Sequence, residues 1–298
     1  MTRSGFVSIS GQPNVGKSTI LNGLLKEKVA IVSNRPETTR DNLRGILTEK
    51  DCQVVFIDTP GIHKPHDLLG KVMLTRAQSS IMESDIILFV TEKRVAFNRD
   101  DDNIVKRLPR PEEGKKVILV INKVDRVKDK KILLPLIEKA LEIYPFDEIV
   151  PISALKPAHL VKLMDVVRTL LPEGPFMYPE DQLTDKNERF LVQEIIREKI
   201  LRETYEEIPH AIAVVVEAWE EDDEADRINI HANVFVERLS QKAIIIGKEG
   251  AMMKKIGKHA RADIERMLDR HVYLDLWVKV FDKWKKDPNA LREMGYAD

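Results

Sequence analysis

Residues 5–18 read Gly-Phe-Val-Ser-Ile-Ser-Gly-Gln-Pro-Asn-Val-Gly-Lys-Ser, an apolar stretch that runs directly into the pattern G-x-x-x-x-G-K-S. A strand before this pattern and a helix after it are typical of a P-loop, whose backbone N–H groups cradle phosphates. The lysine of a P-loop reaches the terminal phosphates, and the following hydroxyl binds Mg2+. We therefore expect a strand over 5–10, a helix over 16–27 and a nucleotide at their junction. The predicted contacts are Gly11, Gln12, Pro13, Asn14, Val15, Gly16, Lys17, Ser18 and Thr19.

Strand and helix patterns continue to alternate after this stretch. Buried strands are expected at 43–49, 52–58, 85–90, 117–121 and 148–152. Helices are expected at 70–82, 100–107, 128–143 and 157–171. Apolar strands separated by helices indicate a mostly parallel sheet with helices on both faces, and such sheets bind ligands beyond the carboxyl ends of their strands. The sequence therefore predicts an α/β P-loop NTPase domain over residues 1–172.

Three more motifs follow the P-loop in the order that a GTPase requires. Asp58-Thr59-Pro60-Gly61 ends an apolar strand, so Asp58 is placed to hold a magnesium-bound water and the Gly61 N–H to meet the γ-phosphate. The carboxylate that ends Asn122-Lys123-Val124-Asp125 can accept two hydrogen bonds from guanine, which adenine cannot supply. We expect GTP or GDP as the ligand. The remaining predicted contacts are Thr59, Pro60, Ile62, Lys123, Ser153, Ala154 and Leu155, with a backbone N–H of the last three offered to guanine O6.

The segment 33–42 lies between the P-loop and Asp58 and contains Thr38 and Thr39. A switch threonine there should give its hydroxyl to Mg2+ and its backbone N–H to the γ-phosphate, which orders the loop only with a triphosphate. Thr39 is our choice and Thr38 the alternative, while two ordinary loop threonines are the non-functional interpretation. The predicted metal ligands are Ser18 and Thr39.

Ile62 follows Gly61 at the position where Ras-like enzymes place a glutamine that orients the attacking water. Isoleucine can neither donate nor accept a hydrogen bond, so intrinsic hydrolysis should be slow and depend on backbone groups, a metal ion or a partner. Catalysis is therefore assigned to Lys17, Thr39 and Gly61. Asn14 is a candidate to help coordinate a monovalent cation such as K+, with stabilisation of the turn as the alternative.

A connector rich in proline and glycine, 171–179, separates this domain from the rest of the chain. We expect a linker over 173–185 and a second domain over 186–298. Its pattern is a helix at 186–204, strands at 212–219 and 228–236, a helix at 241–246, a helix at 251–269 and a strand at 272–280. The acidic run 220–224 is expected to form an exposed hairpin loop, because it lacks the glycine and spacing of a calcium loop.

Gly247-Lys248-Glu249-Gly250 stands between the last two predicted helices of this domain and matches the G-x-x-G loop of KH domains. Together with the order of elements, it predicts an α+β unit of the KH type. KH domains clamp about four nucleotides, so single-stranded RNA is the expected ligand. The glycines let the backbone approach phosphates, and the following helix attracts them. The predicted RNA-binding residues are Lys242, Gly247, Lys248, Glu249, Gly250, Lys254, Lys255, Lys258 and Arg261; Trp277 and Trp284 are candidates for base stacking.

Charge and composition agree with this division. The net charge of −1 for 298 residues conceals 16 acidic and 5 basic residues over 180–226, and 12 basic and 6 acidic residues over 241–286. A localised basic stretch is typical of a surface that binds polyanions, with a solvated surface as the alternative.

No apolar run reaches the ~20 residues of a membrane span. The sequence has one cysteine, Cys52, which lies in an apolar run where a buried, inert thiol is expected. These features indicate a cytoplasmic protein.

Taken together, these motifs resemble the Era family of GTPases over nearly the whole chain. The resemblance implies a Ras-like GTPase domain followed by a type II KH domain that binds the 3′ end of small-subunit (16S) ribosomal RNA. It also implies a role in maturation of the pre-ribosomal small subunit, and a link to the inner face of the bacterial membrane that no residue here requires. A monomer is expected. The resemblance rests on G-x-P-N-V-G-K-S at 11–18, Thr38-Thr39-Arg40, Asp58–Gly61, Asn122–Asp125, Ser240–Gly247 and a tail with Trp284 and Gly295-Tyr296; Gln12 and Leu239 depart from it.

Three other classes of protein fit the sequence less well. A metabolic or RNA-modifying GTPase should carry further catalytic or cofactor residues after position 185, and the sequence offers none. A membrane-remodelling GTPase should carry a long apolar or amphipathic paddle, which is also missing. An RNA-binding protein with an inactive nucleotide pocket is disfavoured by Lys17, Ser18, Asp58 and Asp125, which all match.

Overall fold

The chain forms two compact units in a computed structural model that describes residues 2–35, 37–93, 97–205, 208–222, 224 and 226–297. The first unit comprises Met1–Val32, Thr39–Pro65 and Gly70–Asp185. The second comprises Ser33–Thr38, His66–Leu69 and Lys186–Asp298. Two short segments of the first half of the sequence therefore cluster with the second half.

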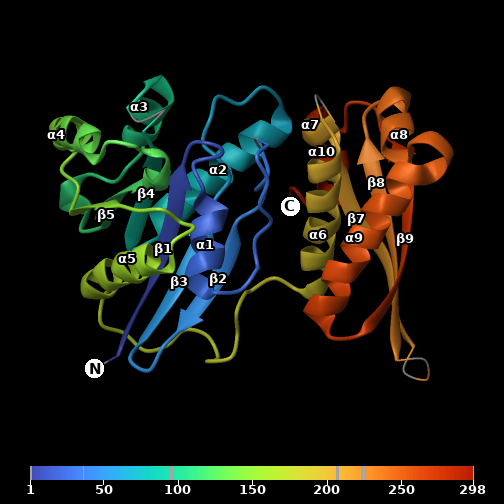
Figure 1. The fold of residues 1–298 in the computed structure, drawn as a ribbon, viewed down its shortest axis with the longest axis horizontal. Helices are drawn as coiled ribbons and strands as arrows, with labels where there is room; N and C mark the ends of the chain where they lie inside the picture. The colour runs from blue at the N-terminus through green and yellow to red at the C-terminus, as the bar shows by residue number, and fades with distance from the viewer. Residues whose placement is uncertain are drawn as a thin grey trace. The chain divides into compact units, whose positions relative to one another are not determined.

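The first unit is built on a six-stranded sheet with the strand order β2-β3-β1-β4-β5-β6 (Figure 1). β2 is antiparallel to β3, and the other neighbours are parallel, as expected from continuous apolar strands. β1 lies between β3 and β4 in the sheet, although β2 and β3 separate β1 from β4 in sequence, so the P-loop after β1 lies between two strand ends. The strands are β1 (Arg3–Gly11), β2 (Leu43–Thr48), β3 (Cys52–Asp58), β4 (Ile86–Glu92), β5 (Lys116–Asn122) and β6 (Glu148–Pro151).

Helices cover both faces of this sheet. α1 (Lys17–Leu25) packs against α5 (Pro157–Leu170) on one face. α2 (Leu68–Glu83), α3 (Arg99–Val105) and α4 (Leu133–Ile143) contribute to a buried cluster on the other face. Alternate residues of β4, such as Ile87 and Phe89, point into that cluster. Because both faces are buried, β4 and β5 are apolar at nearly every position, and the serines of β1, such as Ser8 and Ser10, are buried as well.

α4 begins at Leu133, later than the expected start at residue 128. Short 3-10 turns at Val124–Arg126 and Lys130–Ile132 occupy the preceding residues. Pro135 explains the difference, because proline is tolerated only in the first turn of a helix. A helix from residue 128 would have placed this proline in its interior.

The expected linker packs along the first unit up to Asp185. The amide of Gln53 in β3 bonds the backbone of Met177 and Tyr178 at 2.7 to 3.0 Å. Farther along, the Ile46 N–H donates to the Leu183 carbonyl at 2.8 Å. These bonds hold the connector against the edge of the sheet.

The second unit has a three-stranded sheet with helices packed on it. β7 pairs antiparallel with β8, and β8 pairs parallel with β9. α6 packs against both β7 and α9, as expected for an α+β domain. The helix–strand–strand–helix–helix–strand order agrees with the KH expectation. Its elements are α6 (Glu188–Glu203), β7 (Ala213–Asp222), β8 (Arg227–Val236), α8 (Leu239–Ile246), α9 (Ala251–Leu268) and β9 (His271–Val280). Two short helices were not expected: α7 (Ile208–Ala211) stands between α6 and β7, and α10 (Pro288–Glu293) follows β9.

The acidic run 220–224 is only partly a loop, which corrects the expectation for it. β7 continues to Asp222, and Glu221 pairs across to Ile228 in β8. The Arg270 Nη1 lies 2.8 Å from Glu221 Oε2, so Arg270 offsets part of the negative charge of this run. Asp223 lies outside the described residues. Within the described part of the chain, no helix has the length and apolarity needed to cross a membrane.

Candidate functional site: a nucleotide pocket and a Gly-x-x-Gly loop

The P-loop connects β1 to α1 and buries its lysine. Gly16 caps the helix at φ 100°, and Lys17 is the first helical residue. The Lys17 Nζ donates to the carbonyls of Gly11 at 3.2 Å and Gln12 at 3.0 Å. Burial lowers the pKa of Lys17 to about 8, and the nearby Asp58 carboxylate offsets part of that effect. This buried ammonium is placed for negative phosphate oxygens, which would restore its charge.

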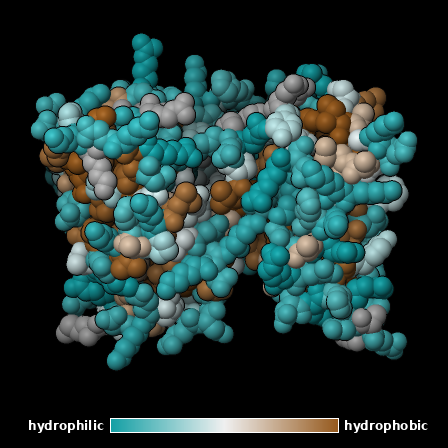
Figure 2. Space-filling view, viewed as in Figure 1, coloured by the Kyte–Doolittle hydropathy of each residue, from teal (hydrophilic) through white to brown (hydrophobic). Residues whose placement is uncertain are grey.

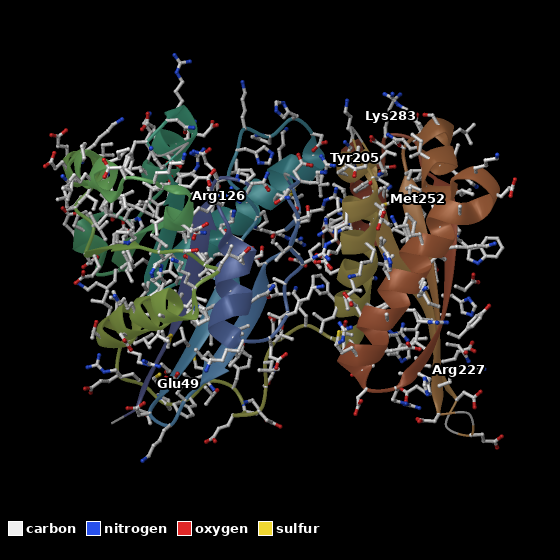
Figure 3. The ribbon with its side chains drawn as sticks, viewed as in Figure 1. Glu49, Arg126, Tyr205, Arg227, Met252 and Lys283 are labelled. Atoms are coloured by element: carbon white, nitrogen blue, oxygen red, sulfur yellow. The ribbon has the colours of Figure 1, made fainter. Side chains whose placement is uncertain are left out.

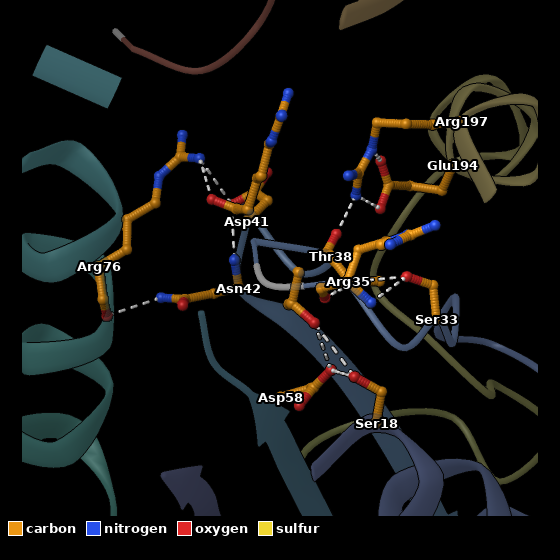
Figure 4. Close-up of polar contacts among 12 residues, drawn as sticks. Ser18, Ser33, Arg35, Thr38, Asp41, Asn42, Asp58, Arg76, Glu194 and Arg197 are labelled. Carbon is orange, nitrogen blue, oxygen red and sulfur yellow. Dashed lines mark hydrogen bonds and ion pairs between the residues drawn. The ribbon is translucent and has the colours of Figure 1, made fainter. Parts of the chain in front are cut away.

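Three oxygen-bearing side chains converge next to Lys17. The Ser18 hydroxyl donates to Asp58 Oδ2 at 2.6 Å, and the Thr39 hydroxyl lies 3.3 Å from the same oxygen (Figure 4). The two hydroxyl oxygens are 3.1 Å apart. Desolvation by burial raises the pKa of Asp58, partly offset by Lys17, and its buried Oδ1 has no hydrogen-bond partner within the described part of the chain. Hard oxygen donors of this kind, with one buried carboxylate oxygen to spare, fit Mg2+ and its water ligands.

The structure distinguishes between the two candidate switch threonines. Thr39 contributes to the oxygen cluster just described. Thr38, by contrast, donates its hydroxyl to the Arg35 carbonyl at 2.7 Å and lies 2.9 Å from the Ser33 hydroxyl. Its side chain therefore closes a turn of the loop and is not available to a metal, which supports Thr39.

The guanine motifs are tied together by Asn122 at the end of β5. Its amide nitrogen donates to the Val15 carbonyl at 2.8 Å, and its oxygen accepts from the Ala154 N–H at 3.0 Å. One asparagine thus holds the P-loop and the loop after β6 in register. Asp125 is exposed, and the Ser153 hydroxyl beside it holds the pKa of that carboxyl below its usual range. Asp125 is therefore ionised and accessible, as acceptance of two guanine hydrogen bonds requires.

Two of the predicted nucleotide contacts have structural roles of their own. Thr59 donates its hydroxyl to the Ile9 carbonyl at 2.8 Å and joins the end of β3 to β1. The Ile62 side chain is buried in the core cluster that includes Phe89, while its N–H donates to the Gly11 carbonyl at 3.1 Å. The Gly61 position abuts the P-loop, since a Cβ there would meet Pro13 at 2.8 Å. Gly61 can thus present its backbone at the phosphates, and Ile62 holds that backbone in place.

The sequence did not reveal that Asn98, Asp101 and His159 support this site. The Gln12 amide donates at 2.7 Å to both Asn98 Oδ1 and Asp101 Oδ1, which ties the P-loop to the start of α3. The His159 Nδ1 accepts from the Ser153 N–H at 2.9 Å and fixes the loop after β6. Asn98 is the N-cap of α3, and asparagine before a helix is a signal that could have located the contact with Gln12. Nothing in the sequence indicates the contact between His159 and Ser153.

The Gly-x-x-Gly loop of the second unit links α8 to α9. Gly247, Glu249 and Gly250 all have positive φ, at 73°, 53° and 76°. A Cβ on Gly247 would also meet Met252 at 2.7 Å, so both the conformation and the close approach require glycine there. Met252 lies at the start of α9 (Figure 3). The loop therefore presents the positive end of an 18-residue helix to solvent, which favours an anion.

The basic residues of α9 divide into two sets. Lys254, Lys258 and Arg261 are exposed and recur at helical spacing on one side. Lys255 lies 2.6 Å from Glu203 of α6, so its charge is already partly neutralised. We therefore expect Lys255 to contribute less to RNA binding than its neighbours. Lys248 and Glu249 are exposed in the loop, and Lys242 is half-buried on α8.

The tryptophans differ in their availability to a base. Trp284 is fully buried, donates to the Ala211 carbonyl at 2.9 Å and stacks on Tyr296, so it is a core residue and cannot stack on RNA. Trp277 is 62% exposed on β9. Apolar surface also gathers over α8 (Figure 2), where Leu239 and Ile244 are exposed beside the loop. Ile244 is thus a better-placed apolar contact for a base than Trp284.

Comparison with known proteins supports both halves of this description. Residues 6–123 match the family model described as a 50S ribosome-binding GTPase, and residues 207–285 match that of the KH domain. The chain is similar to the crystal structure of Era in complex with MgGDPNP and nucleotides 1506–1542 of 16S ribosomal RNA, at 42% identity and TM-score 0.96. It is equally similar to a variant of Era from Aquifex aeolicus bound to GDP and AlF4−, at 42% identity and TM-score 0.95. Each comparison covers 100% of both chains.

Proposed function

The chain belongs to the Era family of GTPases, and from that premise we propose that it is a GTP-driven switch that binds 16S ribosomal RNA. The KH domain binds the 3′ end of this RNA during maturation of the pre-ribosomal small subunit. The observation that carries the proposal is the convergence of Ser18, Thr39 and Asp58, because it brings a switch-loop hydroxyl to the P-loop serine. Support for the RNA comes from the relative of equal length that was crystallised with both MgGDPNP and 16S RNA.

GTP hydrolysis here depends on a few groups of the chain. Mg2+, held by Ser18, Thr39 and a water on Asp58, would neutralise charge on the phosphates. The Lys17 ammonium compensates the negative charge that develops on the leaving phosphates. The backbone N–H groups of Thr39 and Gly61 hold the γ-phosphate, and their preorganisation lowers the cost of charge redistribution. GTP and GDP are therefore distinguished by the backbone at Thr39 in the segment 33–42 and at Gly61 in the motif Asp58–Gly61.

Positioning of the attacking water is the slow part of the reaction. The Ile62 side chain is packed in the core and has no polar atom, so the chain places no glutamine-like group at that point. We propose slow intrinsic hydrolysis that a bound partner or a monovalent cation accelerates. Asn14, at φ 63° in the P-loop, is the residue proposed to help hold K+.

RNA binding is assigned to the loop 247–250 and to the exposed lysines that follow it. The loop backbone and the N-terminus of α9 attract phosphate, and Lys248, Lys254 and Lys258 add positive charge. Single-stranded RNA fits best, because only unpaired bases can reach the apolar surface of α8 beside the loop. We also propose that the protein is a cytoplasmic monomer; peripheral association with the inner face of the membrane is supported by the family resemblance alone.

Crosslinking of the full-length protein to RNA in cells, followed by sequencing of the sites, tests this assignment. We expect crosslinks in the 3′ region of 16S ribosomal RNA that are lost in Lys248→Ala and Gly250→Asp. Arg266→Ala is the matched control, since Arg266 is an exposed basic residue of the same helix, 77% exposed and remote in sequence from the loop. Crosslinks that persist in both loop variants would contradict the RNA assignment.

A further inference from the structure

Half of the switch loop belongs to the second unit. The segment Ser33–Thr38 clusters with the KH half of the chain, whereas Thr39 clusters with the nucleotide site. The segment is closed on itself by the Thr38 hydroxyl and is attached to the end of α6 by Arg35, whose guanidinium donates to the Thr204 carbonyl at 3.2 Å. The boundary between the two units therefore falls at the peptide bond between Thr38 and Thr39.

Arg197 of α6 binds this peptide directly. Its Nη2 donates to the Thr38 carbonyl, and its Nε donates to Glu194 at 2.8 Å (Figure 4). Nη2 also donates to the second oxygen of Glu194 at 2.6 Å, so the carboxylate holds the guanidinium in a bidentate pair. Such a pair fixes the plane of an arginine side chain, and with it the position of the bond to Thr38.

A bond to the Thr38 carbonyl determines the direction of the Thr39 N–H. The two groups belong to one planar peptide, which is trans here, and they therefore point in opposite directions. The same N–H is the group proposed to bind the γ-phosphate, and the Thr39 hydroxyl is already held beside Ser18 and Asp58. Thr39 is thus fixed at its side chain by the nucleotide unit and at its backbone by Arg197.

We propose that Arg197, a residue of the RNA-binding half, is a positioning residue for γ-phosphate recognition. By holding the Thr38–Thr39 peptide, it aims the Thr39 N–H and so favours GTP over GDP without touching the nucleotide. This inference rests on the proposed GTP switch. It adds the element of the KH half through which nucleotide state and RNA binding affect one another.

The surroundings of Arg197 favour this role over a purely structural one. Arg197 is 1% exposed, and its Nη1 has no hydrogen-bond partner among the residues that the structure describes. An apolar side chain of similar volume usually stabilises a buried site as well as a charged pair does. Two residues farther along α6, Lys199 bonds Asp263 of α9, the helix that begins at the Gly-x-x-Gly loop. One rigid helix, α6, therefore bonds both the Thr38 carbonyl and the RNA-binding helix.

The test compares Arg197→Gln and Arg197→Lys with the wild-type protein. The affinity of each full-length protein is measured for GDP and for the non-hydrolysable analogue GMPPNP, both with Mg2+. We expect Arg197→Gln to bind GMPPNP about tenfold more weakly, the size of one lost hydrogen bond to a charged group, with unchanged GDP affinity. Arg197→Lys should lose less, because it keeps the charge but not the fork that binds Glu194 and Thr38 together.

Arg202→Gln is the matched control, because Arg202 lies on the same helix. Among the described residues, its guanidinium donates only to the carboxylate of Glu198 in that helix, at 3.0 Å. This variant should leave both affinities unchanged. An equal loss of GDP and GMPPNP affinity in Arg197→Gln would show a structural role and overturn the inference. Unchanged affinity for both nucleotides would also overturn it. Glu194→Gln provides a second variant that frees the guanidinium without removing it, and it should lose GMPPNP affinity by a smaller factor. If wild-type RNA affinity does not differ between GDP and GMPPNP, the proposed switch fails; if it differs and Arg197→Gln retains the full difference, only this inference fails.

Discussion

The two glycine loops of the molecule present phosphate-binding groups in opposite ways. In the P-loop, Lys17 is buried and its ammonium already bonds two backbone carbonyls. In the Gly-x-x-Gly loop, Lys248 is exposed and the phosphate-binding groups belong to the backbone, which turns through positive φ at Gly247 and Gly250. A buried network selects one ligand through matched contacts, whereas an exposed loop attracts any phosphate backbone through charge.

This difference has a consequence for mutations. Removal of one group from the P-loop leaves its buried partners without bonds, so the loss should be large and specific. Removal of one lysine from the RNA loop leaves its neighbours solvated, so the loss should be small and dependent on salt.

The largest effect should follow from Lys17→Met. The change removes the buried positive charge at the phosphates, and two or more charge-assisted hydrogen bonds with it, so GTP and GDP affinity should fall at least roughly a hundredfold. Nucleotide titration by calorimetry measures this. Lys26→Met, at the exposed end of the same helix, should leave affinity unchanged. A loss below tenfold in Lys17→Met would contradict the buried-network description.

Asp125→Asn should change which base is bound. An amide can donate to the C2 carbonyl of xanthine but cannot accept both guanine hydrogen bonds, so GTP affinity should fall about a hundredfold and xanthosine triphosphate affinity should rise. Competition between the two nucleotides measures the exchange. Asp129→Asn, in the exposed turn that follows, serves as the control. If guanine preference survives in Asp125→Asn, the base is recognised elsewhere.

Lys248→Ala should weaken RNA binding only modestly. The loss of one phosphate contact predicts about three- to tenfold weaker binding, and a slope of log affinity against log salt reduced by about 0.7. Filter binding of a single-stranded 16S 3′-end RNA at several salt concentrations measures both. Arg266→Ala should leave the slope intact. A loss of more than a hundredfold would show that this loop is also a tightly matched site.

The smallest effect is a dependence of nucleotide affinity on pH. The pKa of Lys17 is about 8 in the free protein, and bound phosphates should raise it, so binding takes up a proton above that pH. Affinity for GDP should therefore fall about twofold between pH 7 and pH 8 and more steeply above. The residual binding of Lys17→Met should show no such fall. A rise in affinity over the same range would contradict the sign of this linkage.

The sequence predicted those parts of the molecule in which neighbouring residues act together. The P-loop, the Asp58 motif, the guanine motif and the G-x-x-G loop are contiguous, and their strand–helix context follows from hydrophobic period. The contacts of Gln12 with Asn98, of His159 with Ser153 and of Arg197 with Thr38 join residues far apart in sequence. No periodicity or motif encodes them, because the tertiary fold alone brings the partners together.

The same reason accounts for the local errors. Trp284 lies in a polar, lysine-rich stretch but is buried against Tyr296 and Ala211. The short helix α10 was not expected, although Asp287 followed by Pro288 is a helix-start signal, and the Asp287 side chain indeed caps it. Likewise, nothing in 33–42 indicated that Thr38 and Thr39 would fall in different units.

The central claim is that the nucleotide pocket and the RNA loop depend on one another. It is tested most directly by the affinity of the wild-type protein for a single-stranded RNA from the 3′ end of 16S ribosomal RNA, measured with GMPPNP and with GDP at the same salt concentration. The switch predicts tighter binding with GMPPNP, because a triphosphate orders the segment that Arg197 holds. Equal affinities in the two nucleotide states would contradict it.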